Sequence, residues 1–530
     1  MLACAALLAG GVQWVRLTVD EQAHYGYAWQ IIHFNADRGT DNSKMPFSVL
    51  NVLPKRLAPL LPPGALRTRL NNFLFGRYAT AACTLLLAWA LFWWSRALYG
   101  AAGGLLTLAL VAFDPNILAH GVLITTDLYA TLMTALAVWS FWRLLNHEGP
   151  GAWWVVIGGA ALFGLAQLAK YTCAYLVPIL ALTALGHAAP ELWALARARR
   201  WGGISTKLLA AGKVTAVYAA AFLVVVNIGF LGWVTLKPLR DYDFVSRQFQ
   251  ALQVGLGPLA AVRVPVPEPY LLGLDRVLGD EREGSNVYLL GRLGADGVPG
   301  RRFPEYLAVT WLYKEPIATQ VLLLLALVAY VLRFKRFAFR RNEWPLFCPI
   351  LFFVLYFTFV YNFQIGLRHF LVIHPMLFVF AGSLVRYPRE VHRGAWVTLA
   401  ALLVWLVASV GSYYPNLVAY FNEFLWNRMN AYRIAVDSNL DWGQTDRYLA
   451  RYLRRHPNAH FEPDGPMAGT LVVSSNRFSG YLLGEKFRWL RENFQPIGHV
   501  ASTHLVFQVS PEALLRVTDP VSPDSGDKND

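Results

Sequence analysis

Residues 214–233 read VTAVYAAAFLVVVNIGFLGW and contain no charged side chain. A helix of about twenty apolar residues is long enough to cross the hydrocarbon core of a bilayer. Similar apolar blocks recur along the chain, so the sequence predicts a polytopic α-helical membrane protein with about eleven transmembrane helices. The predicted spans cover residues 1–17, 73–95, 101–118, 123–145, 152–170, 172–188, 209–233, 316–333, 345–362, 367–385 and 395–415.

The composition also favours a membrane protein. Of the 530 residues, 56% are hydrophobic and 15% are charged, whereas an ordinary soluble protein has roughly 25% charged residues. The formal net charge is +14, but the basic residues lie between the apolar blocks. This placement is typical of topology signals and lipid headgroup contacts, and it argues against nucleic-acid binding. The four cysteines lie in apolar blocks, and their spacing predicts neither a metal site nor a disulfide framework.

The orientation follows from the basic connections. Residues 189–207, 333–344 and 386–394 are rich in lysine and arginine, whereas the connection 114–122 contains neither. The positive-inside rule places the three basic connections in the cytoplasm. The N-terminus is then cytoplasmic and the C-terminus external, in a multi-pass plasma (inner) membrane protein. Residues 1–17 lack the basic leading segment and clear cleavage site of a signal peptide, so we interpret them as a first helix, shortened at its start.

These assignments predict three parts of the chain. Residues 1–415 form the transmembrane domain, with long external loops at 18–72 and 234–315. The first loop contains amphipathic stretches that suit the interface, whereas the second is rich in proline and glycine and is expected to be mostly irregular. Residues 416–518 are predicted to form a small external α/β domain, and the polar residues 519–530 a disordered tail.

The α/β prediction depends on three segments of residues 416–518. The segment TDRYLARYLRRHP (445–457) predicts a helix, with Thr445 able to cap its N-terminus. The segments GTLVVSS (469–475) and HLVFQVS (504–510) are rich in β-branched and apolar residues, so they predict strands.

Acidic residues stand at the external boundary of two predicted spans. Asp20 and Glu21 follow the first span, and His24 lies one helical turn later. Carboxylates at a membrane boundary often mark function, although a solvated helix end explains them equally well. Asp127, in HGVLITTDLYATL, either caps a helix together with its threonine neighbours or faces a polar cavity.

Cations occur at the same boundary. Lys170 stands in GLAQLAKYTC, and Arg368 and His369 stand in NFQIGLRHFL. Each cation alone could extend to lipid headgroups, but arginine is also well shaped for bidentate phosphate binding. The segment DSNLDWGQ (437–444) predicts turns, and Trp442 suits the membrane interface, so this segment could simply anchor the external domain.

One predicted face of the membrane therefore gathers carboxylates and cations. This combination suits sugar transfer from a lipid phosphate to a hydroxyl, because the acceptor needs one general base. The leaving phosphate is already an anion and needs cationic stabilisation rather than a proton donor. A glycosidase, by contrast, usually pairs two carboxylates at the bond that it cleaves.

Several motifs resemble those of a known family, the GT-C glycosyltransferases of the protein O-mannosyltransferase type (glycosyltransferase family 39, which includes the dolichyl- or polyprenyl-phosphate-mannose-protein mannosyltransferases). The resemblance runs in the expected order over most of the chain, and DSNLDWGQ is its most specific part. The matching segments are DEQAHYG (20–26), LAHGVLITTDLYATL (118–132), GLAQLAKYT (164–172), YLAVTWLYKEP (306–316), IGLRHFLVIHP (365–375), and YPNLVAYFNEF with VDSNLDWGQ (within 414–444).

The resemblance implies an inverting transferase that uses a polyprenyl-phosphate sugar, such as mannose or another hexose, on the outer face of the membrane. It makes Asp20 the general base and Glu21 the residue that positions the acceptor. Asp127 matches the second-loop acid, with His24 as a further candidate on the acceptor side. Lys170 and Arg368 would contact the donor phosphate, with His369 a weaker candidate. Further loop contacts are expected from Tyr306, Lys314, Asp437, Asn439, Asp441 and Trp442.

The chain departs from the family pattern after the YFNE motif, where FLWNRMN (424–430) stands, and after DWGQ, where Thr445 precedes Asp446. The acceptor therefore stays open between a protein hydroxyl, a lipid and a glycan. No metal site and no obligatory cofactor is predicted, although Asp20 and Glu21 could hold a divalent cation through hard oxygen ligands. The alternatives are a transporter or flippase for a lipid-linked sugar, which often shows repeats and broken helices near the midplane, and an inactive membrane scaffold.

Overall fold

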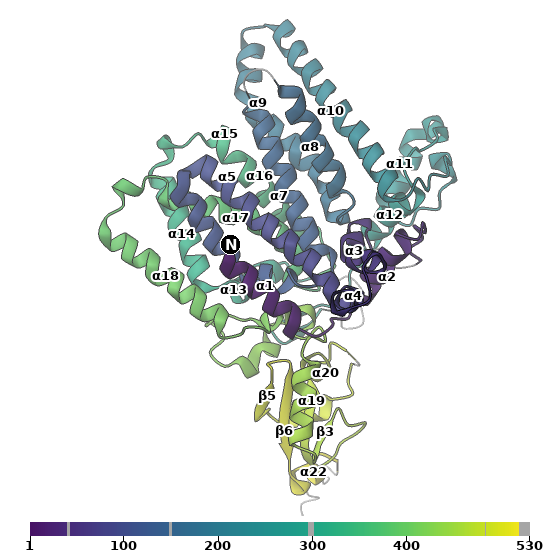
Figure 1. The fold of residues 1–530 in the computed structure, drawn as a ribbon, viewed down its shortest axis with the longest axis vertical. Helices are drawn as coiled ribbons and strands as arrows, with labels where there is room; N and C mark the ends of the chain where they lie inside the picture. Colours follow the sequence, from purple (N-terminus) through teal and green to yellow (C-terminus); the bar gives the residue numbers. More distant parts are fainter. Residues whose placement is uncertain (40–42, 148–150, 295–301, 483, 519–530) are drawn as a thin grey trace, which may run out of the picture.

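The structure, a computed structural model, describes residues 1–39, 43–147, 151–294, 302–482 and 484–518. It is a bundle of long apolar helices with a small sheet-containing part at one end (Figure 1). The predicted tail 519–530 lies outside the described residues. The helices of the bundle are α1 (Leu2–Trp14), α5 (Arg77–Ala112), α6 (Pro115–His120), α7 (Thr126–Leu145), α8 (Ala152–Ala166), α9 (Leu176–Arg197), α10 (Trp201–Gly229), α14 (Ile317–Leu332), α15 (Phe339–Asn342), α16 (Trp344–Phe359), α17 (His374–Ala381) and α18 (Arg393–Gly411).

Every predicted span coincides with helix. Among the described residues, six helices are long and apolar enough to cross a membrane, or up to seven if the bent pair α13–α14 forms one span. Helices α1, α8 and α16 are apolar but shorter. The prediction of a polytopic α-helical membrane fold is thus confirmed, whereas the number of eleven spans stays a prediction.

Helix α5 contains two of the predicted spans. Its course breaks at Gly100, where φ is 82° and ψ is −179°, a conformation that glycine adopts without steric cost. The second segment turns back and packs closely on the first. A Cβ atom on Gly104 would lie only 2.9 Å from the carbonyl oxygen of Phe92. Glycine at both positions therefore lets two short apolar segments form a tight hairpin.

The predicted basic connections meet at one end of the bundle. Arg336 and Glu390, from two different connections, form an ion pair of 2.6 Å, and Asn146 donates to the Arg341 carbonyl at 3.0 Å. The tip of the α9–α10 hairpin lies at this end and the sheet lies at the opposite end (Figure 1). The charge asymmetry of the sequence thus corresponds to two distinct ends of the molecule.

The segments outside the bundle are more helical than predicted. Residues 234–315 were expected to be mostly irregular, and this prediction is wrong for α11 (Arg247–Leu256), α12 (Glu268–Glu283) and α13 (Tyr306–Lys314). The physical reason is that proline and glycine stand at the helix ends: α12 has a proline in its first turn and ends at Gly284, where φ is 78°. The remaining elements are α2 (Glu21–Ile31), α3 (Val49–Leu57), α4 (Ala65–Asn71), and a hairpin of β1 (Tyr288–Leu289) and β2 (Arg292–Leu293).

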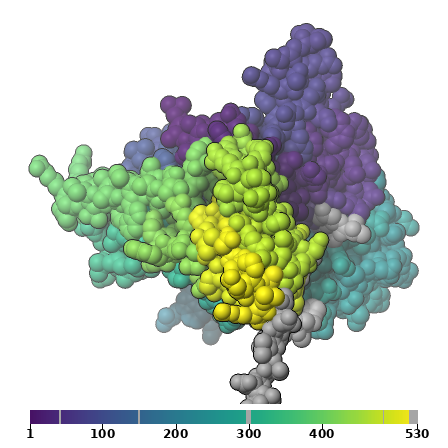
Figure 2. Space-filling model, turned by 90° about the horizontal axis from the view of Figure 1, so that it is seen from below, coloured from purple at the N-terminus to yellow at the C-terminus, as the bar shows by residue number. Residues whose placement is uncertain are grey.

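The C-terminal part folds around a four-stranded sheet. The strand order is β3-β4-β6-β5, with β3 parallel to β4 and the other pairs antiparallel. Viewed from this end, the C-terminal residues stand in front of the rest of the molecule (Figure 2). The elements are α19 (Asp446–Arg455), β3 (Ala459–Phe461), β4 (Gly469–Ser474), α20 (Ser475–Phe478), α21 (Arg488–Asn493), β5 (Gly498–Val500), β6 (His504–Val509) and α22 (Pro511–Thr518).

The two faces of this sheet have different partners. Alternate residues such as Leu471 and Phe507 pack on the chain between the last span and α19, including Leu440. On the opposite face, Val472 and Val506 pack against Leu449 of α19. Strand alternation therefore fixes the sheet to the segment that carries DSNLDWGQ.

Both predicted strands and the predicted helix are confirmed by β4, β6 and α19. The predicted cap of α19 is wrong in its chemistry. Thr445 occupies the N-cap position without a side-chain cap bond among the described residues, and its hydroxyl instead bonds that of Thr503 at 2.6 Å. The residue therefore ties the helix to the edge of the sheet.

Candidate active site

Asp20 and Arg368 meet across most of the length of the chain. Asp20 stands at the N-cap of α2, but its side chain does not cap the helix. Instead, Oδ2 accepts a hydrogen bond of 2.9 Å from Nη1 of Arg368, which lies in the 3₁₀ helix η8 (Leu367–Ile373). The Asp20 side chain keeps 35% of its surface exposed and that of Arg368 keeps 10%. The pair is therefore reachable from outside the protein.

Asp127 links this pair to Lys170. Asp127 lies in the first turn of α7, whose N-cap Thr125 makes no side-chain cap bond within the described chain. Lys170 Nζ donates to Asp127 Oδ1 at 2.6 Å, and Asp127 Oδ2 lies 3.8 Å from Arg368 Nη1. Of the two sequence interpretations, the structure favours the polar cluster over the cap. We call Asp20, Asp127, Lys170 and Arg368 the open cluster.

Trp442 packs against Arg368 of the open cluster. Its ring lies 4.1 Å from the Arg368 guanidinium carbon, within the range of a cation–π contact. Trp442 is only 5% exposed, so it packs inside the protein, and its predicted position at the membrane interface stays a prediction. On its other side, Trp442 contacts His120, with 5.9 Å between ring centroids. Burial and the nearby Arg368, Lys314 and Lys170 lower the pKa of His120 to about 4, although Asp127 opposes the shift.

Three of the predicted loop contacts, Tyr306, Lys314 and Asn439, form a hydrogen-bonded group next to Arg368, which we call the clamp. Asn439 Oδ1 accepts from the backbone N–H of Leu367, directly before Arg368, at 2.9 Å. The Asn439 amide donates to the Tyr306 hydroxyl at 2.9 Å. Lys314 Nζ donates to the carbonyl of Asn439 at 2.6 Å and to that of Val418 at 2.7 Å. These residues fix the backbone next to Arg368. The Lys314 ammonium group donates to backbone carbonyls, so it does not take part in the open cluster.

Asp437 and Asp441 lie beside this clamp. Asp437 has a left-handed backbone, with φ of 58°, and its N–H donates to the Asn476 amide oxygen at 2.7 Å. Burial raises the pKa of Asp437 to about 6, although Arg368 opposes the shift. Burial raises the pKa of Asp441 to about 7. DSNLDWGQ thus contributes a titratable carboxyl close to Arg368.

Glu21 faces away from the open cluster into a second ion pair. Its carboxylate accepts from Arg77 Nε at 2.7 Å and Nη2 at 2.5 Å, from Thr18 at 2.9 Å and from the Ile124 N–H at 3.0 Å. Both charged side chains are 0% exposed. This geometry gives Glu21 a structural role in place of the predicted contact with the acceptor. Asp20 and Glu21 also face different arginines, so they do not converge as metal ligands.

Arg77 was not identified from the sequence. It opens a long apolar block, where a lone arginine is ordinarily explained by a contact with lipid headgroups. In the structure it also donates to the carbonyls of Val15 at 2.6 Å and Arg16 at 2.8 Å. We call Arg77 and Glu21 the closed pair. It joins α1, α2 and α5.

A cavity of about 270 Å³ lies beside the open cluster. Lys170 and His369 line it together with the apolar residues Met45, Val277 and Phe363. The ring Nδ1 of His369 lies 2.5 Å from the Tyr361 hydroxyl, another residue that sequence reasoning missed. Glu281 also lines the cavity, and burial raises its pKa. His24 is buried in α2 at 2% exposure and does not line this cavity.

Residues 65–211 match the model of a family described as dolichyl-phosphate-mannose-protein mannosyltransferase. The chain is a glycosyltransferase. The match confirms the predicted family resemblance, and the matched segment contains Asp127 and Lys170 of the open cluster. Together with the apolar helices, it also confirms an integral membrane protein.

Two solved structures of ArnT from Cupriavidus metallidurans are similar in outline. The apo crystal structure aligns at 14% identity with a TM-score of 0.30, covering 96% of this chain and 96% of that chain. The crystal structure bound to undecaprenyl phosphate aligns at 14% identity with a TM-score of 0.29, covering 97% of each. A comparison with curated protein sequences gave no match.

Proposed function

We propose that the chain transfers a sugar from a polyprenyl-phosphate donor to a hydroxyl acceptor, with inversion at the anomeric carbon, at the end of the bundle that carries Asp20. The observation that carries the proposal is the open cluster, in which Arg368 contacts both carboxylates and Lys170 pairs with Asp127. The cluster lies opposite the basic end, so it faces outward across an inner membrane by the positive-inside rule.

The donor phosphate would bind between Lys170 and Arg368. Both cations are paired with carboxylates, and both keep part of their side chains exposed, 20% for Lys170 and 10% for Arg368. A phosphate entering here would exchange one anionic partner for another rather than meet a bare cation. The adjoining cavity gives room for a sugar or the first part of the lipid, with apolar walls at Met45, Val277 and Phe363.

Asp20 is the proposed general base. It is the more accessible carboxylate of the open cluster, with 35% exposure against 2% for Asp127. Asp20 takes the hydroxyl proton while the acceptor oxygen forms its bond to the sugar C1. The bond from C1 to the phosphate oxygen breaks, and the polyprenyl phosphate leaves as an anion stabilised by Lys170 and Arg368. No acid is needed for the leaving group, so Asp127 serves to position the two cations.

The sugar is proposed to be a hexose, and the description of the matching family favours mannose. The acceptor belongs to one of three classes with a reactive hydroxyl: a protein serine or threonine, a lipid, or a glycan. No divalent cation enters the proposed step, because Lys170 and Arg368 supply the positive charge at the phosphate.

The test is sugar transfer by the purified full chain in lipid, supplied with a panel of polyprenyl-phosphate sugars and membrane extract. Asp20→Asn is compared with wild type and with Asp241→Asn, which removes an exposed carboxylate outside the open cluster. We expect wild type and Asp241→Asn to transfer one of the sugars and folded Asp20→Asn to lose about 10²–10⁴-fold in rate. Analysis of the product anomer checks the inversion.

Other outcomes would redirect the proposal. Equal transfer by Asp20→Asn would remove Asp20 as the base. Movement of labelled donor across the bilayer without release of its sugar would favour a flippase. If no donor is bound or transferred, the proposed function is wrong and a scaffold role becomes the better explanation.

A further inference from the structure

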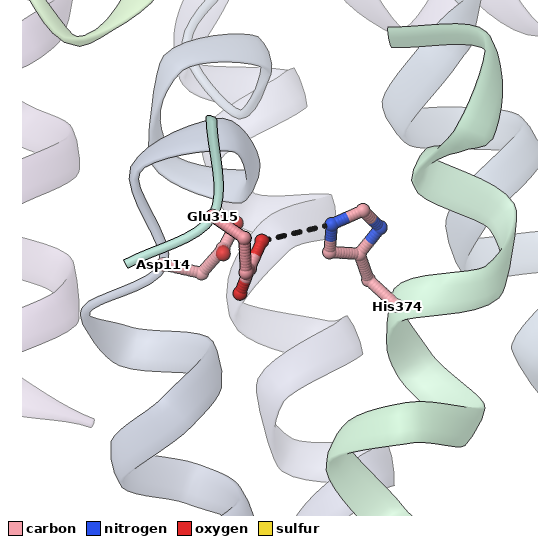
Figure 3. A group of neighbouring side chains, drawn as sticks. All are labelled: Asp114, Glu315 and His374. Carbon is pink, nitrogen blue, oxygen red and sulfur yellow. Dashed lines mark hydrogen bonds and ion pairs between the residues drawn. The ribbon is translucent and has the colours of Figure 1, made fainter. Parts of the chain in front are cut away.

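A second polar cluster lies inside the helical bundle. Asp114 follows α5, Glu315 stands at the 112° bend between α13 and α14, and His374 opens α17. Figure 3 shows the two carboxylates on one side and the His374 ring facing them from the other. In the sequence, each of the three residues directly precedes a proline at the start of a helix. Residues from three distant segments thus converge where helices begin.

The donor atoms of these residues are close enough to share one ion. One ligand atom from each residue lies within 4.8 Å of the others. His374 Nε2 lies 3.2 Å from Glu315 Oε2. All three side chains are completely buried, at 0% exposure. The arrangement is therefore a closed, preformed cluster rather than a group of surface acids.

Two carboxylate oxygens of the cluster accept no hydrogen bond from the surrounding described residues. Asp114 Oδ1 accepts from the Ile117 N–H at 2.6 Å, but Asp114 Oδ2 and Glu315 Oε1 are buried without a hydrogen-bond partner among the described residues. The neighbouring cation does not compensate, because Lys314 Nζ donates to two backbone carbonyls elsewhere. Two buried carboxylates need a counter-charge, since uncompensated buried charge is strongly unfavourable.

We propose that Asp114, Glu315 and His374 bind one divalent transition-metal ion of the zinc or manganese class. Two carboxylate oxygens and one imidazole nitrogen form a ligand set that such ions accept, and a double positive charge balances the two carboxylates. The burial of all three ligands points to a structural ion. The ion would fasten the end of α5 and the α13–α14 bend to α17, and α17 continues directly from η8 with Arg368.

The competing arrangement is a single proton shared by the two carboxyl groups, which also relieves their repulsion. The two arrangements differ in metal content. A bound ion that fastens three segments also stabilises the folded protein, by an amount that grows with the concentration of free ion. Metal content and thermal stability therefore separate the two without any activity measurement.

The experiment measures metal content by mass spectrometry and Tm for the purified full chain, before and after a strong chelator and after addition of Zn²⁺ or Mn²⁺. We expect about one ion per chain in wild type, a lower Tm after chelation, and recovery with one of the two ions. Glu315→Gln and His374→Asn should lose the ion. Glu343→Gln, which alters a buried carboxyl near Arg386, should retain it.

Wild type alone decides the question if the variants fail to fold. A wild-type chain without bound metal, whose Tm responds to neither chelator nor added ion, would overturn the metal site in favour of the shared proton. Equal metal content in Glu315→Gln, His374→Asn and wild type would also overturn it, because the ion would then lie elsewhere. Loss of sugar transfer plays no part in either result, so the proposed function is tested separately.

Discussion

The closed pair and the open cluster begin at adjacent residues and differ in almost every physical respect. Glu21 and Arg77 are both fully buried, and the Glu21 carboxylate is saturated by side-chain and backbone donors. Asp20, its neighbour, makes one hydrogen bond to Arg368 and stays one-third exposed, at 35%. A buried carboxylate whose oxygens all accept hydrogen bonds from the protein stabilises the fold. A partly exposed carboxylate with one such bond can instead form a new hydrogen bond to a substrate.

The closed pair should respond to substitution through stability. Arg77→Met removes the only side chain that joins Glu21 to the carbonyls of Val15 and Arg16 in the described structure. Leaving one buried charge without its partner costs about 3–5 kcal/mol. We therefore expect a much lower Tm and a low yield of folded protein.

A double variant separates the cost of an unpaired buried charge from the loss of Arg77 itself. Glu21→Gln with Arg77→Met removes both charges, so it should be more stable than Arg77→Met alone. If Arg77→Met instead keeps the wild-type Tm but abolishes sugar transfer, Arg77 belongs to the catalytic machinery and the distinction between the two sites fails.

The open cluster should respond through catalysis. Lys170→Met keeps the length of the side chain and removes one cation from the proposed phosphate site. Loss of one group that stabilises developing charge costs about 10²–10³-fold in rate. The matched control is Lys237→Met, which removes a half-exposed lysine paired with Glu268. Transfer rates decide the outcome, and a wild-type rate in Lys170→Met would show that Lys170 does not contact the donor.

A smaller effect is expected at Trp442. Trp442→Leu removes the ring that lies 4.1 Å from the Arg368 guanidinium carbon. A cation–π contact contributes about 0.5–2 kcal/mol, so we expect a loss of roughly 2- to 30-fold in kcat/KM. Arg368 keeps its hydrogen bond to Asp20 in this variant. A greater loss than that of Lys170→Met would mean that the ring contacts substrate.

The smallest effect should come from Asp437, whose buried carboxyl has a pKa raised to about 6. A raised pKa means that the folded state favours the protonated acid, so its stabilising contribution is present at low pH and is lost as the pH rises through about 6. Asp437→Asn should therefore gain in Tm relative to wild type between about pH 4 and pH 7, the range that spans the ordinary and the raised pKa. A difference in Tm that is constant over this range would contradict the burial of the charge.

Part of this picture could be predicted from the sequence. The four residues of the open cluster each interrupt or border an apolar block. All four were predicted on the same side of the membrane, and this shared side was the reason to expect a common site. Their pairing could not be predicted, because contacts such as Asp20 with Arg368 depend on how the helices pack. For the same reason Glu21 was grouped with Asp20, although helix α2 turns the two carboxylates toward different arginines.

Other features were visible only as local signals. A tryptophan in a turn near the membrane, such as Trp442, is typical of the interface. Its buried contact with Arg368 depends on tertiary packing around Asn439, which the sequence does not show. Asp114, Glu315 and His374 each precede a proline, but nothing in their spacing shows that three helix starts converge.

We propose that the open cluster holds both a general base, Asp20, and a phosphate site at Lys170 and Arg368. The most direct measurement is binding of a polyprenyl-phosphate sugar, followed by a single turnover, in wild type, Asp20→Asn and Lys170→Met. We expect Asp20→Asn to bind the donor as wild type does and to fail to transfer the sugar, whereas Lys170→Met should lose donor affinity. Transfer at the wild-type rate by donor-loaded Asp20→Asn would contradict the proposal.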